Sequence, residues 1–140
     1  MFDKKLAKLE KNRNLEKNTN FVKKLNNYAY KAIENCENLV TALLTIEEKT
    51  EGLDQAILNK FLLLGRFHSK VIRSDQIKKI ESMNNSLSYY EKAKEHIGRI
   101  RKENRTIPEI EEQSRICEEM CELVPINISR LNAQLHKKKK

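Results

Sequence analysis

Cysteine and histidine are the side chains in this sequence best suited to metal binding or nucleophilic catalysis, and there are three of each. Cys117 and Cys121 are four residues apart, which puts both on one face of a helix but is not the C-x-x-C spacing of zinc or redox motifs. We interpret them, with Cys36, as small core residues, because a free cysteine packs like a buried apolar side chain. The alternative is a metal site completed by His136. An odd number of cysteines without a signal peptide indicates a reducing compartment.

No arrangement typical of an enzyme is visible in the sequence. None of the histidines has a serine, cysteine or acid near it in a recognisable nucleophile pattern. Gly65 stands alone, so there is no glycine-rich phosphate loop. His68 falls on an apolar stripe, where we expect a packed core residue rather than a ligand. We therefore expect a protein without catalytic activity that needs no cofactor and no metal.

The composition indicates that helices must position these residues. The 140 residues include only Gly 3 and Pro 2, which leaves few turns for a many-stranded sheet. Charged residues make up 34% and hydrophobic residues 39%, a balance that favours amphipathic helices. No apolar run is long enough for a membrane span. We expect one all-α domain.

Hydrophobic spacings of three and four residues predict five or six helices with short loops, and hence antiparallel neighbours. Residues 1–20 are predicted to form a short basic helix, marked by Phe2, Leu6 and Leu9, and a polar loop. Residues 21–135 are predicted to form the main helical domain, and residues 136–140 a disordered lysine tail. The predicted helices span about 21–50, 53–73, 77–100 and 110–124, with Pro125 ending the last of these or starting another.

Two of these helices carry patterns that predict how they pack. The first long helix has one predicted apolar stripe: Phe21, Leu25, Tyr28, Ala32, Cys36, Leu39 and Leu43. An uncovered flank of this helix would leave apolar surface open at the end of a helical stack. The run 61–64 is apolar all round, which predicts neighbours on more than one side. Gly65 follows it and permits a close helix approach because it has no Cβ.

The chain also follows the tetratricopeptide pattern loosely. Gly65 and His68 fit the first helix of such a repeat, and Tyr90 and Ala93 fit the second. The two halves are separated by about nine residues more than the repeat has, so the repeat is elongated.

Four runs, in this order and spacing, resemble the C-terminal part of the kinesin family binding protein (KIF-binding protein) family: 64–72, 86–91, 117–125 and 128–131. The resemblance covers roughly residues 21–131. It implies a tetratricopeptide-like α-solenoid fragment that binds kinesin motor domains and blocks their engagement with microtubules. Family members are longer, which leaves a fragment, a truncated product and one subunit of a larger assembly as alternatives.

A motor surface that binds acidic microtubules should be basic, so an inhibitor of it would present acids. The densest acidic turn in the sequence is the first candidate contact: Glu47, Glu48, Glu51 and Asp54. A solvated loop without a partner is the alternative. A second candidate is a basic helix face that would suit an acidic partner such as tubulin: Arg66, Lys70 and Arg73.

Charge leaves a second functional hypothesis open. The formal net charge is +8, with both ends basic and the body from 25 to 129 mildly acidic. The chain could therefore be a structural cytoskeletal protein that binds microtubules or a larger assembly through its basic ends. Nucleic acid is the least favoured partner, because basic patches interleaved with aromatic residues are absent. Either leading hypothesis predicts a cytoplasmic protein associated with the cytoskeleton.

Overall fold

The structure is a computed structural model, and it describes residues 15–71 and 75–138. These residues form four helices and no strand: α2 (Leu15–Leu44), α3 (Glu51–Lys70), α4 (Gln76–Lys102) and α5 (Ile110–Lys138). The all-α prediction is confirmed. The short helix predicted around Phe2 lies outside the described residues.

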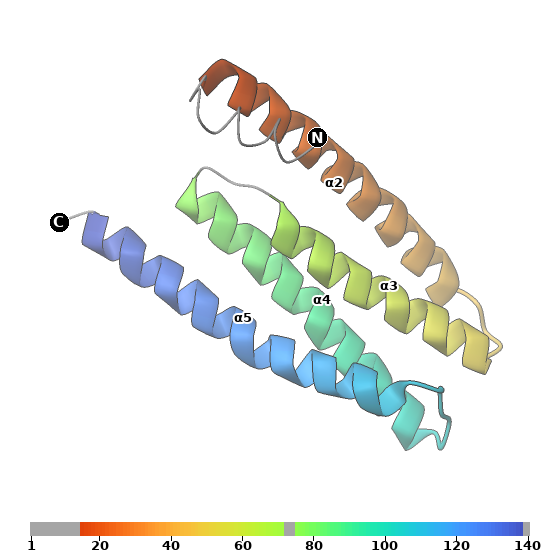
Figure 1. The fold of residues 1–140 in the computed structure, drawn as a ribbon. Coiled ribbons are helices and arrows are strands. Elements are labelled where there is room, and N and C mark those ends of the chain that lie inside the picture. The colour runs from red at the N-terminus through yellow and green to blue at the C-terminus, as the bar shows by residue number, and fades with distance from the viewer. Residues whose placement is uncertain (1–14, 72–74, 139–140) are drawn as a thin grey trace.

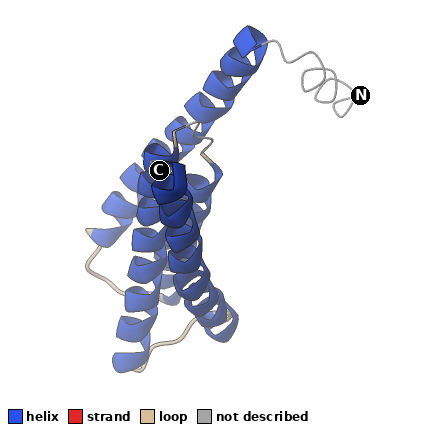
Figure 2. Cartoon of the chain, turned by 90° about the vertical axis from the view of Figure 1, so that its left-hand side faces the viewer, coloured by secondary structure: helices blue, strands red, loops and turns tan. Residues whose placement is uncertain are grey.

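The helices run alternately up and down, and α2 lies at one edge of the molecule and α5 at the other (Figure 1). Helix α3 packs against both α2 and α4, and α4 packs against α5. In the described part of the chain, extensive interfaces join only helices that follow one another in the sequence. The N-terminal end of α2 extends past the other helices (Figure 2).

The centre of the core lies on α3. Ile57, Leu58 and Leu64 have no exposed surface, because α2 covers one side of this helix and α4 covers another. This confirms the prediction, made from the run 61–64, that the helix has neighbours on more than one side. Helix α2 contributes Ile33, and α4 contributes Ile100, to the same cluster.

Helices α3 and α4 come closest at Gly65. A Cβ added to this residue would lie 2.7 Å from the Tyr90 ring, well inside normal contact distance. The Ser86 hydroxyl donates a hydrogen bond to the Gly65 carbonyl oxygen at 2.6 Å. The missing side chain therefore lets Tyr90 pack directly on the α3 backbone, which confirms the close helix approach predicted at Gly65.

The apolar stripe predicted along α2 is wrong in part. Cys36 is buried against α3, but Leu25, Tyr28 and Leu39 are 40%, 72% and 51% exposed. The residues that pack on α3 with Cys36 are Ile33 and Val40. Helix α2 carries two adjacent apolar faces with the same spacing, and periodicity alone cannot say which face a neighbour covers.

The prediction that Pro125 ends a helix or starts another is also wrong. Helix α5 continues through Pro125, so five or six expected helices become four in the described segments. This helix runs on to Lys138, into the stretch predicted as a tail, and α2 already begins at Leu15, within the predicted loop. No helix in the described segments is both long enough and apolar enough to cross a membrane.

Candidate protein-interaction surface

The turn between α2 and α3 carries the acidic residues singled out in the sequence. Glu47 and Glu48 are exposed in the connection, and Glu51 is exposed in the first turn of α3. Thr50 caps this helix, and its hydroxyl oxygen accepts a hydrogen bond from the Leu53 backbone N–H at 3.1 Å. An acid in the first helical turn also interacts favourably with the helix dipole. The structure therefore brings three of the four predicted acids together on one exposed turn.

Asp54 was predicted to belong to this turn, and the structure corrects this. It has no exposed surface, and Arg105 donates a hydrogen bond to its Oδ2 atom. Arg105 also pairs with Glu103, with Nε donating to Oε2 at 2.7 Å. A buried carboxylate needs such a partner, because an unpaired one would carry the full cost of desolvation. Asp54 therefore holds the fold together and is not available for a partner protein.

The loop after α4 has the geometry that brings Arg105 to Asp54. Asn104 has a φ of 55°, in the left-handed region that asparagine tolerates. The Arg105 N–H donates to the Ile100 carbonyl at 2.9 Å, and the Asn104 N–H donates to the Arg101 carbonyl at 3.1 Å. These two bonds form the Schellman motif that ends many helices. The turn places Arg105 beside Asp54 of α3, although the two residues are far apart in the sequence.

His96 completes this buried polar cluster. Its Nε2 atom lies 3.4 Å from Asp54 Oδ1. Burial lowers the pKa of His96, and the positive charges of Arg99 and Lys49 lower it further, while Glu103 opposes them. Asp54 would favour the protonated form, but its charge is already matched by Arg105. We conclude that His96 is neutral near pH 7.

The basic face predicted on α3 lies away from the acidic turn. Arg66 and Lys70 are both exposed, and Arg73 lies outside the described residues. Glu51 and Arg66 are separated by about 22 Å along the helix axis, at 1.5 Å per residue. The two candidate contact regions are therefore separate surfaces at opposite ends of α3.

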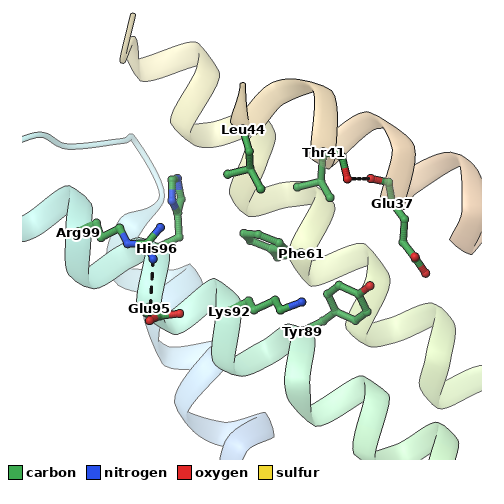
Figure 3. Close-up of a pocket in the computed structure, with 10 residues that line it drawn as sticks. Glu37, Thr41, Leu44, Phe61, Tyr89, Lys92, Glu95, His96 and Arg99 are labelled. Carbon is green, nitrogen blue, oxygen red and sulfur yellow. Dashed lines mark hydrogen bonds and ion pairs between the residues drawn. The ribbon is translucent and has the colours of Figure 1, made fainter. Parts of the chain in front are cut away.

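A groove between α2 and α4 was not predicted. It has a volume of about 310 Å³, and Phe61 of α3 forms its floor (Figure 3). Lys92 lies 4.8 Å from the centroid of the Tyr89 ring, and Arg99 pairs with Glu95 at 3.9 Å. Positively and negatively charged side chains therefore line this open, partly apolar groove. No pattern in the sequence predicts this groove, because it exists only where two separate helices flank a third.

Next to the groove, His68 is packed as the sequence predicted. Its ring stacks on Tyr89 with 5.4 Å between the centroids and 12° between the planes. Its Nε2 atom lies 4.0 Å from Glu37 Oε1 on α2. Burial raises the pKa of Tyr89, and the negative charge of Glu37 and a hydrogen bond with Glu37 raise this pKa further. His68 therefore links α2, α3 and α4.

The cysteines are free thiols. Cys36 and Cys117 are buried as predicted, whereas Cys121 is only half-buried. The Cys36 thiol donates a weak hydrogen bond to the Lys60 carbonyl at 3.5 Å. Burial raises the pKa of all three, that of Cys117 to about 11. Within the described ranges, no three metal-ligating side chains gather into a site.

In its described part the chain is all-α, with antiparallel helices, an acidic turn and an open groove. Its family is shown by sequence: the chain belongs to the KIF-1 binding protein C-terminal family, whose family model matches residues 1–131. This range includes the part placed in that family by the resemblance of residues 21–131. Searches of curated proteins and of solved structures gave no match.

Proposed function

We propose that this chain is an interaction module that binds kinesin motor domains and blocks their engagement with microtubules. Membership of the KIF-1 binding protein C-terminal family carries the proposal. The role requires no catalytic group and no cofactor, and it places the chain in the cytoplasm beside microtubules. In the described part of the chain, successive antiparallel helices pack mainly on their sequence neighbours, and this arrangement supports a tetratricopeptide-like solenoid as the scaffold.

The acidic turn is the proposed contact with the motor. Glu47, Glu48 and Glu51 are exposed on one short segment, and the Thr50 cap fixes where the helix behind them begins. A motor surface that binds acidic tubulin is basic, so these three carboxylates complement it. Such charge contacts mainly raise the association rate, and the binding should weaken as the salt concentration rises.

Charge reversal tests this contact. We expect the triple substitution Glu47→Lys, Glu48→Lys and Glu51→Lys to weaken binding to a motor domain by about tenfold or more. The matched control reverses three exposed acids elsewhere, Glu81, Glu91 and Glu118, with the same change in net charge. Isothermal titration or fluorescence anisotropy gives the dissociation constants. Equal losses in both variants would show that net charge, not the turn, governs binding.

The broader proposal is tested by titrating the full chain against a panel of isolated motor domains, with polymerised tubulin alone in parallel. Saturable binding to some motors, with release of those motors from microtubules, is the expected result. Binding to neither would refute the proposal.

Direct binding to tubulin is the second candidate function. The exposed side chains of Arg66 and Lys70 on α3 favour it, since tubulin is acidic. Co-sedimentation of the chain with polymerised tubulin in the absence of any motor would support this candidate instead.

A further inference from the structure

Helix α2 exposes an apolar stripe that no helix of the described structure covers. Leu25, Tyr28 and Leu39 are 40%, 72% and 51% exposed, and Phe21 and Ala32 are half-buried on the same face. Their spacing of 21, 25, 28, 32 and 39 follows a heptad pattern, which is typical of a face that packs against another helix. Helix α2 has its extensive interface with α3, through the adjacent face that carries Ile33 and Val40.

Lysines border this stripe. Lys24 and Lys31 are exposed and one heptad apart, on the side of the stripe away from α3. No acid occurs between residues 20 and 33. A helix that packs on the stripe should therefore be apolar along one line and acidic beside it.

Helix α5, at the opposite edge of the molecule, has this character (Figure 1). Leu123 is 51% exposed, and Ile116 and Met120, which lie seven and three residues before it, are half-buried. Glu112 and Glu119 are exposed along the same side of the helix. Glu119 also forms an ion pair with Arg115 at 2.7 Å, but both side chains are more than half exposed, so this pair is weak.

We propose that copies of this chain associate head to tail, with the α2 stripe of one copy packed on the acidic face of α5 of the next. Each copy then presents α2 at one end and α5 at the other, so the interface does not close on itself and adds helices to a continuous stack. The occupant of the α2 stripe is a second copy of the chain. This inference goes beyond the proposed function and does not rest on it.

Sedimentation velocity of the full chain alone, over a range of concentrations, tests the association. We expect the average mass to rise with concentration. Leu39→Glu should weaken the association by about tenfold or more, because it puts a charge into the apolar stripe that the interface buries. The matched control is Ile77→Glu on α4, which is also 51% exposed but lies on neither proposed face. Circular dichroism confirms that both variants remain folded.

A charge exchange tests which two helices meet. The double variant Lys24→Glu/Lys31→Glu and the double variant Glu112→Lys/Glu119→Lys should each fail to associate alone. Mixed together they should associate again, because every α2–α5 contact then joins opposite charges.

Two outcomes overturn the proposal. If the chain stays monomeric at every concentration, it does not form the α2–α5 interface between copies. Association that survives Leu39→Glu, or that the mixture of charge variants does not restore, means that other surfaces meet. Because no motor domain is present in these experiments, their outcome is independent of the proposed function.

Discussion

At the scale of single residues, the structure separates exposed acids from an acid that holds the fold together. Glu51 and Asp54 are one helical turn apart, yet the first is exposed and the second has no accessible surface. The sequence alone does not show which of these two carboxylates is buried. The difference arises because the side chain of Asp54 faces Arg105, which a turn late in the sequence delivers.

Gly65 gives the sharpest prediction at this scale. Gly65→Ala should lower the free energy of unfolding by about 1–3 kcal/mol, because the new methyl group would overlap the Tyr90 ring. Urea denaturation followed by circular dichroism measures the change. Gly98→Ala is the control: nothing lies within 4 Å of its added Cβ, so it should stabilise α4 by about 0.5–1 kcal/mol. A stabilising effect of Gly65→Ala would contradict the close packing of α3 on α4.

His96 makes stability depend on pH. Its pKa in the folded chain is lowered by burial, whereas an unfolded histidine takes up its proton near pH 6.5. The unfolded state therefore binds more protons below about pH 6.5, and the free energy of unfolding should fall as the pH drops below that value. Chemical denaturation at several pH values measures the slope, and His96→Gln should make it shallower. An unchanged slope in this variant would mean that other groups dominate.

At the scale of the elements, the sequence predicts that helices exist better than it predicts where they end. The three longest predicted helices each appear as a helix, because their apolar spacing extends over many turns. The prediction failed at Pro125, since tertiary packing on α4 keeps α5 continuous there at the cost of a backbone hydrogen bond. It failed along α2 because the choice between two apolar faces depends on which neighbour is present.

Dependence on tertiary neighbours also explains which parts of the candidate site the sequence could predict. Three of the predicted acids lie exposed on one turn, because a charged turn between helices is visible in the sequence. Asp54 was misplaced, and the groove over Phe61 was missed, because both depend on contacts between helices far apart in the chain.

Pro125 allows a test at this scale. Pro125→Ala should raise the melting temperature, because alanine restores the N–H donor that α5 lacks at this position. The expected gain is about 1–3 kcal/mol, reduced by whatever packing the half-buried proline ring supplies. Thermal denaturation measures it. A loss of stability would show that α5 needs a bend at Pro125 to follow α4.

At the scale of the whole molecule, stability should be highest in the middle of the stack. Helix α3 is covered on two sides, whereas the N-terminal part of α2 extends past its neighbours (Figure 2). Amide hydrogen exchange should therefore be slowest in 57–65 and faster in 20–30, since amides exchange through local opening where few apolar contacts must break. Mass spectrometry of peptic fragments measures both segments. The measurement is made at a concentration where the chain is monomeric. Equal protection of the two segments would then contradict the expectation that the middle of the stack is the most stable part.

The packing of each helix mainly on its sequence neighbours has a mechanical consequence. A force that pulls the two ends of the chain apart passes through the α2–α3, α3–α4 and α4–α5 interfaces in series. Interfaces loaded in series yield one at a time, starting with the weakest, so the chain should lengthen in steps and behave as a compliant spring.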